Sequence, residues 1–214
     1  MAPLYDETYI SNLALSHIGS PPIPSWDGNS VEAIQTEQVF PIARDMTLAL
    51  HDWGFASRYE DLTPAPDTET YTGWDYVYAY PDECLCFQEI VDPAKGHLPM
   101  MRSMIRRYDQ PPAIKWEPVV NVTETVRRIC TNQIDAEGRY TTRIENLTLW
   151  SIPALEALAC VLGSRLAVIL KGDIVRKRTL MDEARMYTGL AEGHDAGEQE
   201  DQPDDSSSFS QSRL

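Results

Sequence analysis

The segment "SIPALEALACVLGSRLAVIL", residues 151–170, decides the predicted fold. Ser151 and Pro153 mark the start of a helix, because a serine N-cap and a proline in the first turn are both favoured there. Five large apolar residues then follow at steps of three, four, four and three, which places them on one side of the helix. They are Leu155, Leu158, Leu162, Leu166 and Ile169. Such a side is buried in a helical bundle, so other helices must pack against it.

The chain after this segment predicts a second helix of the same bundle. Gly172 and Asp173 end the first helix and cap the next one. Apolar residues then recur at helical spacing, and they are Leu180, Ala184, Tyr187 and Ala191. We therefore expect two consecutive helices between residues 151 and 193.

The N-terminal segment predicts a third helix. Asp6 can cap its start, Gly19 can cap its end, and Pro21 and Pro22 prevent its continuation. Its apolar positions are Tyr9, Ile10, Leu13, Ala14 and either His17 or Ile18.

A fourth helix is expected to begin after Ser30, with Glu32 in its first turn, where the helix dipole favours a negative charge. Its apolar stripe is formed by Val39, Ala43, Met46 and Leu50. Pro41 cannot donate a hydrogen bond to the carbonyl of Glu37, so we expect either a kink at this point or two separate helices.

The motif "HDWGFA", residues 51–56, has two interpretations. In the first it ends the helix: Gly54 is left-handed, Phe55 contacts Leu50 one turn back, and His51 and Asp52 occupy the last turn. In the second, the histidine and the aspartate belong to an active site. That pair would need a nucleophile from elsewhere, and neighbouring side chains on a helix point about 100° apart. The residues favour the helix end.

The middle of the chain changes to a period of two, which is typical of β-strands. Trp74, Tyr76, Tyr78 and Tyr80 would share one face of a strand, with polar and small residues on the other. Further strands are expected within 84–91, 104–120, 126–132 and 138–144, separated by Pro, Asp and Gly turns.

Together these elements predict an α+β fold. Residues 1–56 and 147–193 would form a helical bundle, into which residues 57–146 insert an antiparallel β domain. Residues 194–214 are acidic, rich in serine and poor in apolar side chains, so we expect a flexible C-terminal extension.

Composition argues against several classes of protein. With 33 acidic and 18 basic residues the net charge is −15, which disfavours tight binding of nucleic acid. No unbroken run of 18 apolar residues occurs, so we expect no membrane span. The start "MAPLYDETYI" lacks the basic and apolar regions of a signal peptide. Neither a CxxC pair nor zinc-ligand spacing occurs among the cysteines, which we expect to be free thiols: Cys84, Cys86, Cys130 and Cys160.

No catalytic, cofactor-binding or metal-binding residue is predicted. The common phosphate-loop, nucleotide, hydrolase and zinc motifs do not occur. The histidines are scattered along the chain at His17, His51, His97 and His194. A glycosidase needs only two carboxylates, and Asp75, Glu83 and Glu89 lie near the aromatic strand. Aromatic residues at a period of two, however, more often form the packed face of a sheet.

Candidate interface residues are of two kinds. Six arginines occur in locally basic segments: Arg106, Arg107, Arg127, Arg128, Arg176 and Arg178. They are either solvated residues that pair with the abundant acids, or subunit contacts, where arginine is enriched. Phe209 and Leu214 in the acidic extension are either incidental or anchors that dock on a partner.

Four segments occur in an order that matches a known family. "NLALSHIGSPPIPSWD" (12–27) looks like its opening helix and turn, and "ARDMTLALHDWGFA" (43–56) looks like its Arg-initiated second helix. "WDYVYAYPDECLCF" (74–87) is similar to its tryptophan-led strand. "ICTNQIDAEGRYTTRIENLTLWSIPALEALACVLGSRLA" (129–167) is similar to its hairpin and a late helix. Over about residues 9–170 the chain therefore resembles the tail tubular protein A family, the head-to-tail adaptors of short-tailed bacteriophages.

The resemblance implies a structural protein without a cofactor. Members of the family form a ring, commonly of twelve copies, in the virion at the head–tail junction, after assembly in the host cytoplasm. The helical part meets the portal protein and the β part faces the tail nozzle protein, with tail fibres as a further possible neighbour. Genomic DNA passes through the lumen without specific binding, and no membrane is involved. The extra proline and tryptophan of "SPPIPSWD" depart from the family's usual turn.

The charge agrees with such a ring, because a lumen that repels phosphates lets DNA slide. We therefore expect the channel surface to be acidic or neutral. Two alternatives stay open at this stage. One is a peptidoglycan-cleaving tail component, which would clear a peptidoglycan suspension. The other is a monomeric binding protein of the host cytosol, which would form no ring with a portal.

Overall fold

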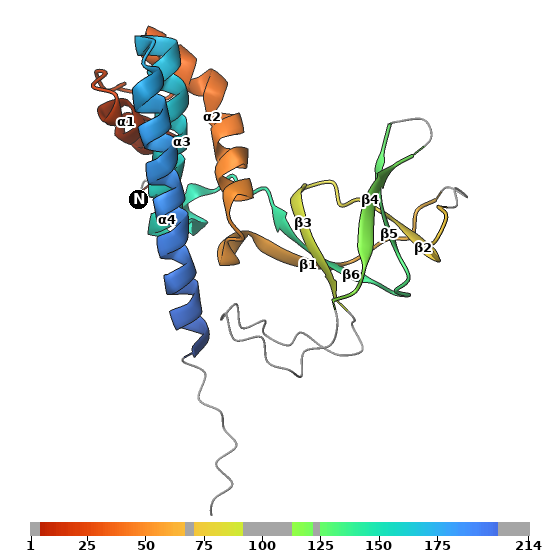
Figure 1. Ribbon diagram of the computed structural model, residues 1–214. Helices are drawn as coiled ribbons and strands as arrows, with labels where there is room; N and C mark the ends of the chain where they lie inside the picture. The colour runs from red at the N-terminus through yellow and green to blue at the C-terminus, as the bar shows by residue number, and fades with distance from the viewer. Residues whose placement is uncertain (1–4, 67–70, 92–112, 122–124, 201–214) are drawn as a thin grey trace, which may run out of the picture.

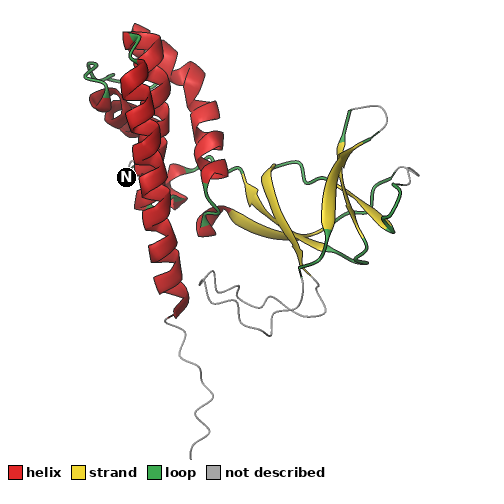
Figure 2. Ribbon diagram, viewed as in Figure 1, coloured by secondary structure: helices red, strands yellow, loops and turns green. Residues whose placement is uncertain are grey.

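The computed structural model describes residues 5–66, 71–91, 113–121 and 125–200, with side chains up to Ala191. Over these residues it confirms the α+β fold, with a helical bundle on one side and two small antiparallel sheets on the other (Figures 1 and 2). The helices are α1 (Glu7–His17), α2 (Val31–Leu50), α3 (Ile152–Lys171) and α4 (Ile174–Glu200). The strands are β1 (Ser57–Asp61), β2 (Tyr76–Ala79), β3 (Cys84–Val91), β4 (Trp116–Val120), β5 (Arg127–Thr131) and β6 (Glu137–Thr142).

Helix α3 is the centre of the bundle. α1, α2 and α4 each pack against it, and they make few contacts with one another. Helices from both ends of the chain therefore lie side by side (Figure 1). The predicted leucine stripe is buried at Leu155, Leu158, Leu162 and Leu166. Ile169, the fifth member, is 46% exposed, because it lies in the last turn of α3 at the open end of the bundle.

The same helix is long and apolar enough, by length and composition, to cross a membrane. Within the described residues, however, 67% of its apolar window is buried against the rest of the protein. Gly163 shows how closely it packs: a Cβ added there would lie 3.2 Å from the carbonyl oxygen of Ala14 in α1. Burial of this extent is the property of a core helix in a bundle.

The predicted helix ends are confirmed at four of the caps. The Asp6 carboxylate accepts from the backbone N–H of Tyr9 at 2.7 Å, and the Ser30 hydroxyl accepts from that of Ala33 at 3.2 Å. Gly19 and Gly172 both have a positive φ, +62° and +65°, the left-handed conformation that glycine adopts without strain.

Helix α2 continues through Pro41 without a break, so two separate helices are not formed. Its buried side includes Ala43 of the predicted stripe together with Phe40 and Thr47. Val39 and Met46 are partly buried against the same core.

Helix α4 carries the predicted buried positions at Leu180, Ala184 and Ala191. It continues to Glu200, beyond residue 194, where the flexible extension was expected to begin. Its last residues are glutamates and a glutamine, which favour helix, and the next proline is Pro203. Residues 201–214, with the candidate anchors Phe209 and Leu214, lie outside the described residues.

The prediction for the end of α2 is wrong in its details. The backbone of His51 is already extended, so it and Asp52 lie beyond the last turn. Gly54 has no positive φ, and it begins a short 3-10 helix, η1 (Gly54–Ala56). The buried Trp53 closes the helix instead, because its indole N–H donates to the carbonyl of Thr47 at 2.9 Å. A side chain thus satisfies a carbonyl near the helix end.

The inserted β unit, β1 to β6, consists of two three-stranded antiparallel sheets rather than one continuous sheet. The first has the order β1-β6-β3 and the second β2-β5-β4. β1 was not predicted, and β2 is shorter than expected, so Trp74 and Tyr80 flank it. Phe87 and Trp116 join the two sheets, with ring centroids 4.7 Å apart. Residues 104–112, within which a strand was expected, lie outside the described residues.

Candidate assembly surfaces

The neighbouring residues His51 and Asp52 have a structural role. The carboxylate of Asp52 forms an ion pair with Arg139 of β6 and accepts a hydrogen bond from the Ser57 hydroxyl at 2.9 Å. The ring of His51 meets that of Trp53 edge-on, with centroids 4.8 Å apart. These contacts connect the end of α2 to the β unit, which supports the helix-end interpretation over an active site.

Arginines form most of the ionic contacts at the junction between the bundle and the β unit. Arg139 pairs with Glu89 at 3.0 Å as well as with Asp52. Arg143 makes two-pronged contacts with Asp45 of α2, the shortest at 2.7 Å. These hydrogen bonds raise the pKa of the Arg143 guanidinium. Arg139 and Arg143 were not singled out from the sequence, because their partners are up to 98 positions away.

The three carboxylates considered for a sugar-cleaving site are placed differently. Glu89 is held by Arg139, and Glu83 lies 3.4 Å from the guanidinium of Arg58. Asp75 belongs to the other sheet, beside the start of β2, where its backbone N–H donates to Asn132. The geometry is one of ion pairs within the sheets and gives no support to paired catalytic acids.

One cysteine lies near a histidine and a glutamate. The Cys160 sulfur is 3.9 Å from His17 Nδ1 and 4.0 Å from Glu183 Oε2. Cys160 is fully buried, and this burial raises the pKa of its thiol to about 12. A protonated, inaccessible thiol is not a nucleophile. Across the described parts of the chain, no group of three or more His, Cys, Asp or Glu side chains could hold a metal ion.

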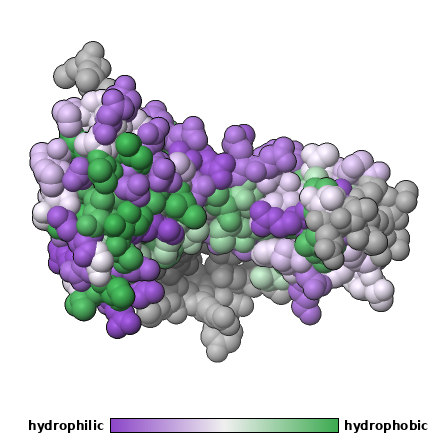
Figure 3. Space-filling model, turned by 90° about the horizontal axis from the view of Figure 1, so that it is seen from above, coloured by the Kyte–Doolittle hydropathy of each residue, from purple (hydrophilic) through white to green (hydrophobic). Residues whose placement is uncertain are grey.

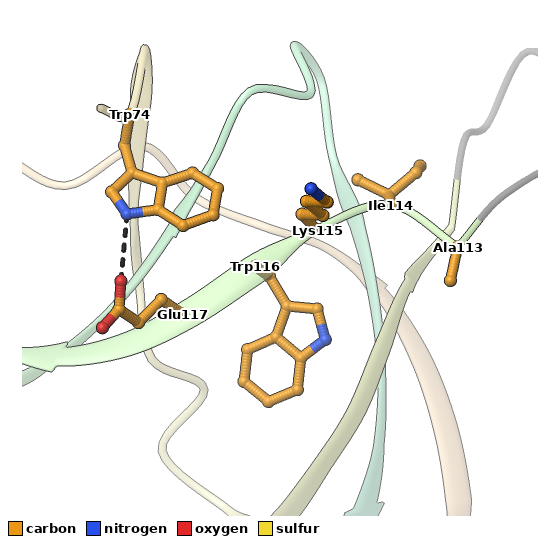
Figure 4. A pocket seen from close by; sticks show the side chains of 6 residues that line it. All are labelled: Trp74, Ala113, Ile114, Lys115, Trp116 and Glu117. Carbon is orange, nitrogen blue, oxygen red and sulfur yellow. Dashed lines mark hydrogen bonds between the residues drawn. The ribbon is translucent and has the colours of Figure 1, made fainter.

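A shallow pocket of about 420 Å³ lies beside β4 (Figure 4). The indole N–H of Trp74 donates to Glu117 at 3.1 Å across it, and Trp116 forms part of its wall. Ala113, Ile114 and Lys115 complete the lining. Among the described residues that line the pocket, Glu117 carries the only carboxylate, and an intramolecular hydrogen bond already occupies it.

The candidate interface arginines have different surroundings. Arg127 packs over the Tyr80 ring at 4.1 Å, and Arg128 is buried in β5. Arg176 donates from Nε to the carbonyl of His17 at 2.8 Å, which links α4 to the end of α1. Arg178 is exposed on α4. Arg106 and Arg107 lie outside the described residues, so their role stays a prediction.

Exposed apolar side chains on the bundle form two rows that the sequence patterns did not reveal. The α2 row consists of Val31, Ile34 and Ile42, and the α4 row of Val175, Met186 and Leu190. Further exposed apolar residues, Val168, Ile169 and Ile174, lie where α3 ends and α4 begins. Figure 3, which views the bundle from this end, shows apolar side chains exposed over it. Apolar surface of this kind marks interaction sites on soluble proteins.

The rows were missed because each helix was assigned one apolar face. Ile42 and Leu190, for example, fall outside the stripes that face α3, and they are 54% and 58% exposed. A count of apolar positions off the predicted stripe could have identified them.

A scan against protein-family models finds no family that matches the chain, and a search of curated proteins finds no match. The function is therefore inferred from the residues and their arrangement.

Proposed function

We propose that the chain is a structural head-to-tail adaptor of a phage virion. Copies of it, twelve by the resemblance, would form a ring between the portal protein and the tail nozzle protein, around the channel through which DNA leaves. The observation that carries the proposal is the packing of α1, α2 and α4 around α3, with the β unit inserted between α2 and α3. The four segments that resemble the family occur in this same order along the chain: the first two in α1 and α2, the third in β2 and β3, and the fourth from β5 to α3.

Two further properties support an assembly role. The bundle exposes the α2 row and the α4 row, which gives it more than one surface for partners. The net charge of −15 suits a protein that surrounds DNA without gripping it, because each cationic contact to a phosphate would add affinity and drag. Arg139 and Arg143 hold the bundle and the β unit together, so one subunit can span from one partner to the other.

The test is to look for the chain in phage particles. Mass spectrometry of purified virions should detect it, and cryo-electron microscopy of the head–tail junction should place the bundle against the portal and the β unit toward the nozzle. Particles that lack the chain, or a channel lined continuously by Arg and Lys, would contradict the proposal.

A separate assay addresses the enzyme alternative. The purified protein should leave a peptidoglycan suspension unchanged. Clearing of the suspension that a single substitution such as Glu89→Gln abolishes, without unfolding the protein, would instead identify a peptidoglycan-cleaving component. Asp182→Asn is the matched control, since that carboxylate is also paired with an arginine but lies on α4, away from the candidate carboxylates.

A further inference from the structure

The two apolar rows of the bundle have matched spacing. Val31 and Ile42 on α2 are eleven positions apart, and so are Val175 and Met186 on α4. Eleven residues make about three turns of an α-helix, so each pair lies on one side of its helix and spans about 17 Å. The two rows therefore present large apolar side chains at equal intervals.

Each row faces away from the centre of the bundle. α2 buries Ala33, Phe40 and Thr47, whereas Ile42 lies on a different side of the helix and is 54% exposed. α4 buries Leu180, Ala184 and Ala191, whereas Met186 and Leu190 are exposed. α2 and α4 both pack on α3 and make few contacts with each other, so each helix has an exposed side of its own for a neighbouring copy.

The two helices also run in the same direction. Both begin at the end of the bundle where α3 finishes, and both run toward the opposite end (Figure 1). A rotation about an axis parallel to the bundle would keep Val31 of one copy near the height of Val175 in the next. Ile42 would then lie near the height of Met186.

Charged residues lie beside each row. Glu37 is exposed on α2, and Glu32 is half-buried there. Arg178 and Arg185 are exposed on α4 next to its row. Arg185 also contacts Asp182 at 3.1 Å, but both side chains are mostly exposed, so that pair is weak and can rearrange. Glu32 and Glu37 lie on opposite sides of the α2 row, about 140° apart around the helix, and Asp182 is exposed among the residues of the α4 row. The complementary charges are therefore those of Glu32 in one copy and Arg178 in the next.

We propose that the α2 row of one copy packs against the α4 row of the next copy. This inference rests on the proposed ring, and it names the surface through which copies of the chain contact one another. Such a contact is heterologous, because two different surfaces meet, and repetition of a heterologous contact closes a ring when the rotation permits. An isologous dimer would instead join two identical rows.

The test uses one variant in each row, Ile42→Glu and Leu190→Glu, in the full chain. Sedimentation velocity at increasing concentration should show that the wild type self-associates. Each variant alone should weaken association about tenfold or more, because a charge would be placed in an apolar contact. Ile134→Glu is the matched control: Ile134 is 56% exposed, but it lies in the β unit.

Mixing the two variants distinguishes the possible contacts. An equimolar mixture should recover a heterodimer and nothing larger, because only the intact α2 row of one variant can meet the intact α4 row of the other. Failure of the mixture to associate while the wild type does would overturn the heterologous contact. A wild type that stays monomeric up to its solubility limit would overturn it as well.

The test of the α2–α4 contact and the test of the adaptor function can fail independently. Virions that contain the chain at the head–tail junction, while both row variants associate like the wild type, would leave the adaptor function standing and remove this interface. Virions without the chain would remove the adaptor function, even where the α2–α4 contact holds in solution.

Discussion

The indole N–H of Trp53 donates a 2.9 Å hydrogen bond to the carbonyl of Thr47, and this contact takes the place of a glycine cap at the end of α2. Trp53 is almost fully buried, so Trp53→Phe would keep most of the packing but leave the carbonyl without its donor. We expect the free energy of unfolding to fall by about 1–3 kcal/mol, measured by urea denaturation.

Trp74→Phe provides the control for that variant. The indole of Trp74 donates to Glu117 at an exposed site, where water can replace the bond, so its loss should cost less than about 1 kcal/mol. Equal losses for the two variants would show that the hydrogen bond to Thr47 does not stabilise the helix end.

Two glycines predict opposite effects of the same substitution. A Cβ at Gly138 in β6 would lie 2.8 Å from side-chain carbons of both Leu62 and Phe87, so Gly138→Ala should destabilise the β unit by about 1–3 kcal/mol. A Cβ at Gly189 in α4 would meet nothing within 4 Å, so Gly189→Ala should stabilise the helix by about 0.5–1 kcal/mol. Thermal unfolding measures both, and a shift of equal sign would contradict the packing described for Gly138.

The ion pairs of Arg139 should matter more than those on the surface. Arg139→Met would leave the carboxylates of Asp52 and Glu89 without their cation, at side-chain exposures of only 17% and 22%. We expect a loss of about 2–3 kcal/mol in urea denaturation, because an uncompensated and partly buried charge is costly. Arg185→Met is the control, because its exposed pair with Asp182 should contribute less than about 1 kcal/mol. Similar losses would mean that the junction is not held by these charges.

Much of the fold could be predicted because its signals are local. Asp6, Ser30 and Gly172 mark helix ends through contacts within a few residues, and the leucines of α3 repeat at helical spacing. The end of α2 could not be predicted in the same way, since the cap comes from a tryptophan side chain that folds back on Thr47.

Contacts between residues far apart in the sequence could not be predicted from local sequence patterns. The division of the β unit into two sheets depends on which strands pair, and β3 pairs with β6 across about 50 positions. The Arg139 and Arg143 contacts span 87 and 98 positions. Of the candidate assembly surface, the sequence predicted the exposed Arg178. It could not predict the α2 and α4 rows, because their exposure depends on which side of each helix faces α3.

Buried thiols make the stability of the bundle depend on pH in alkaline solution. Burial raises the pKa of Cys160 from 9.0 to about 12, so the folded state keeps this proton at a pH where the unfolded chain has lost it. The stabilisation from the neutral thiol is fully present below pH 9 and is lost as the pH rises toward 12, by about 1.4 kcal/mol per pH unit. Urea denaturation at pH 8, 10 and 11 should therefore show a shallower decline for Cys160→Ala than for the wild type. Ser164→Ala, at another buried position of α3 that carries no thiol, is the matched control and should decline with pH as the wild type does. Parallel declines for all three proteins would show that the Cys160 thiol ionises in the folded bundle as readily as in the unfolded chain.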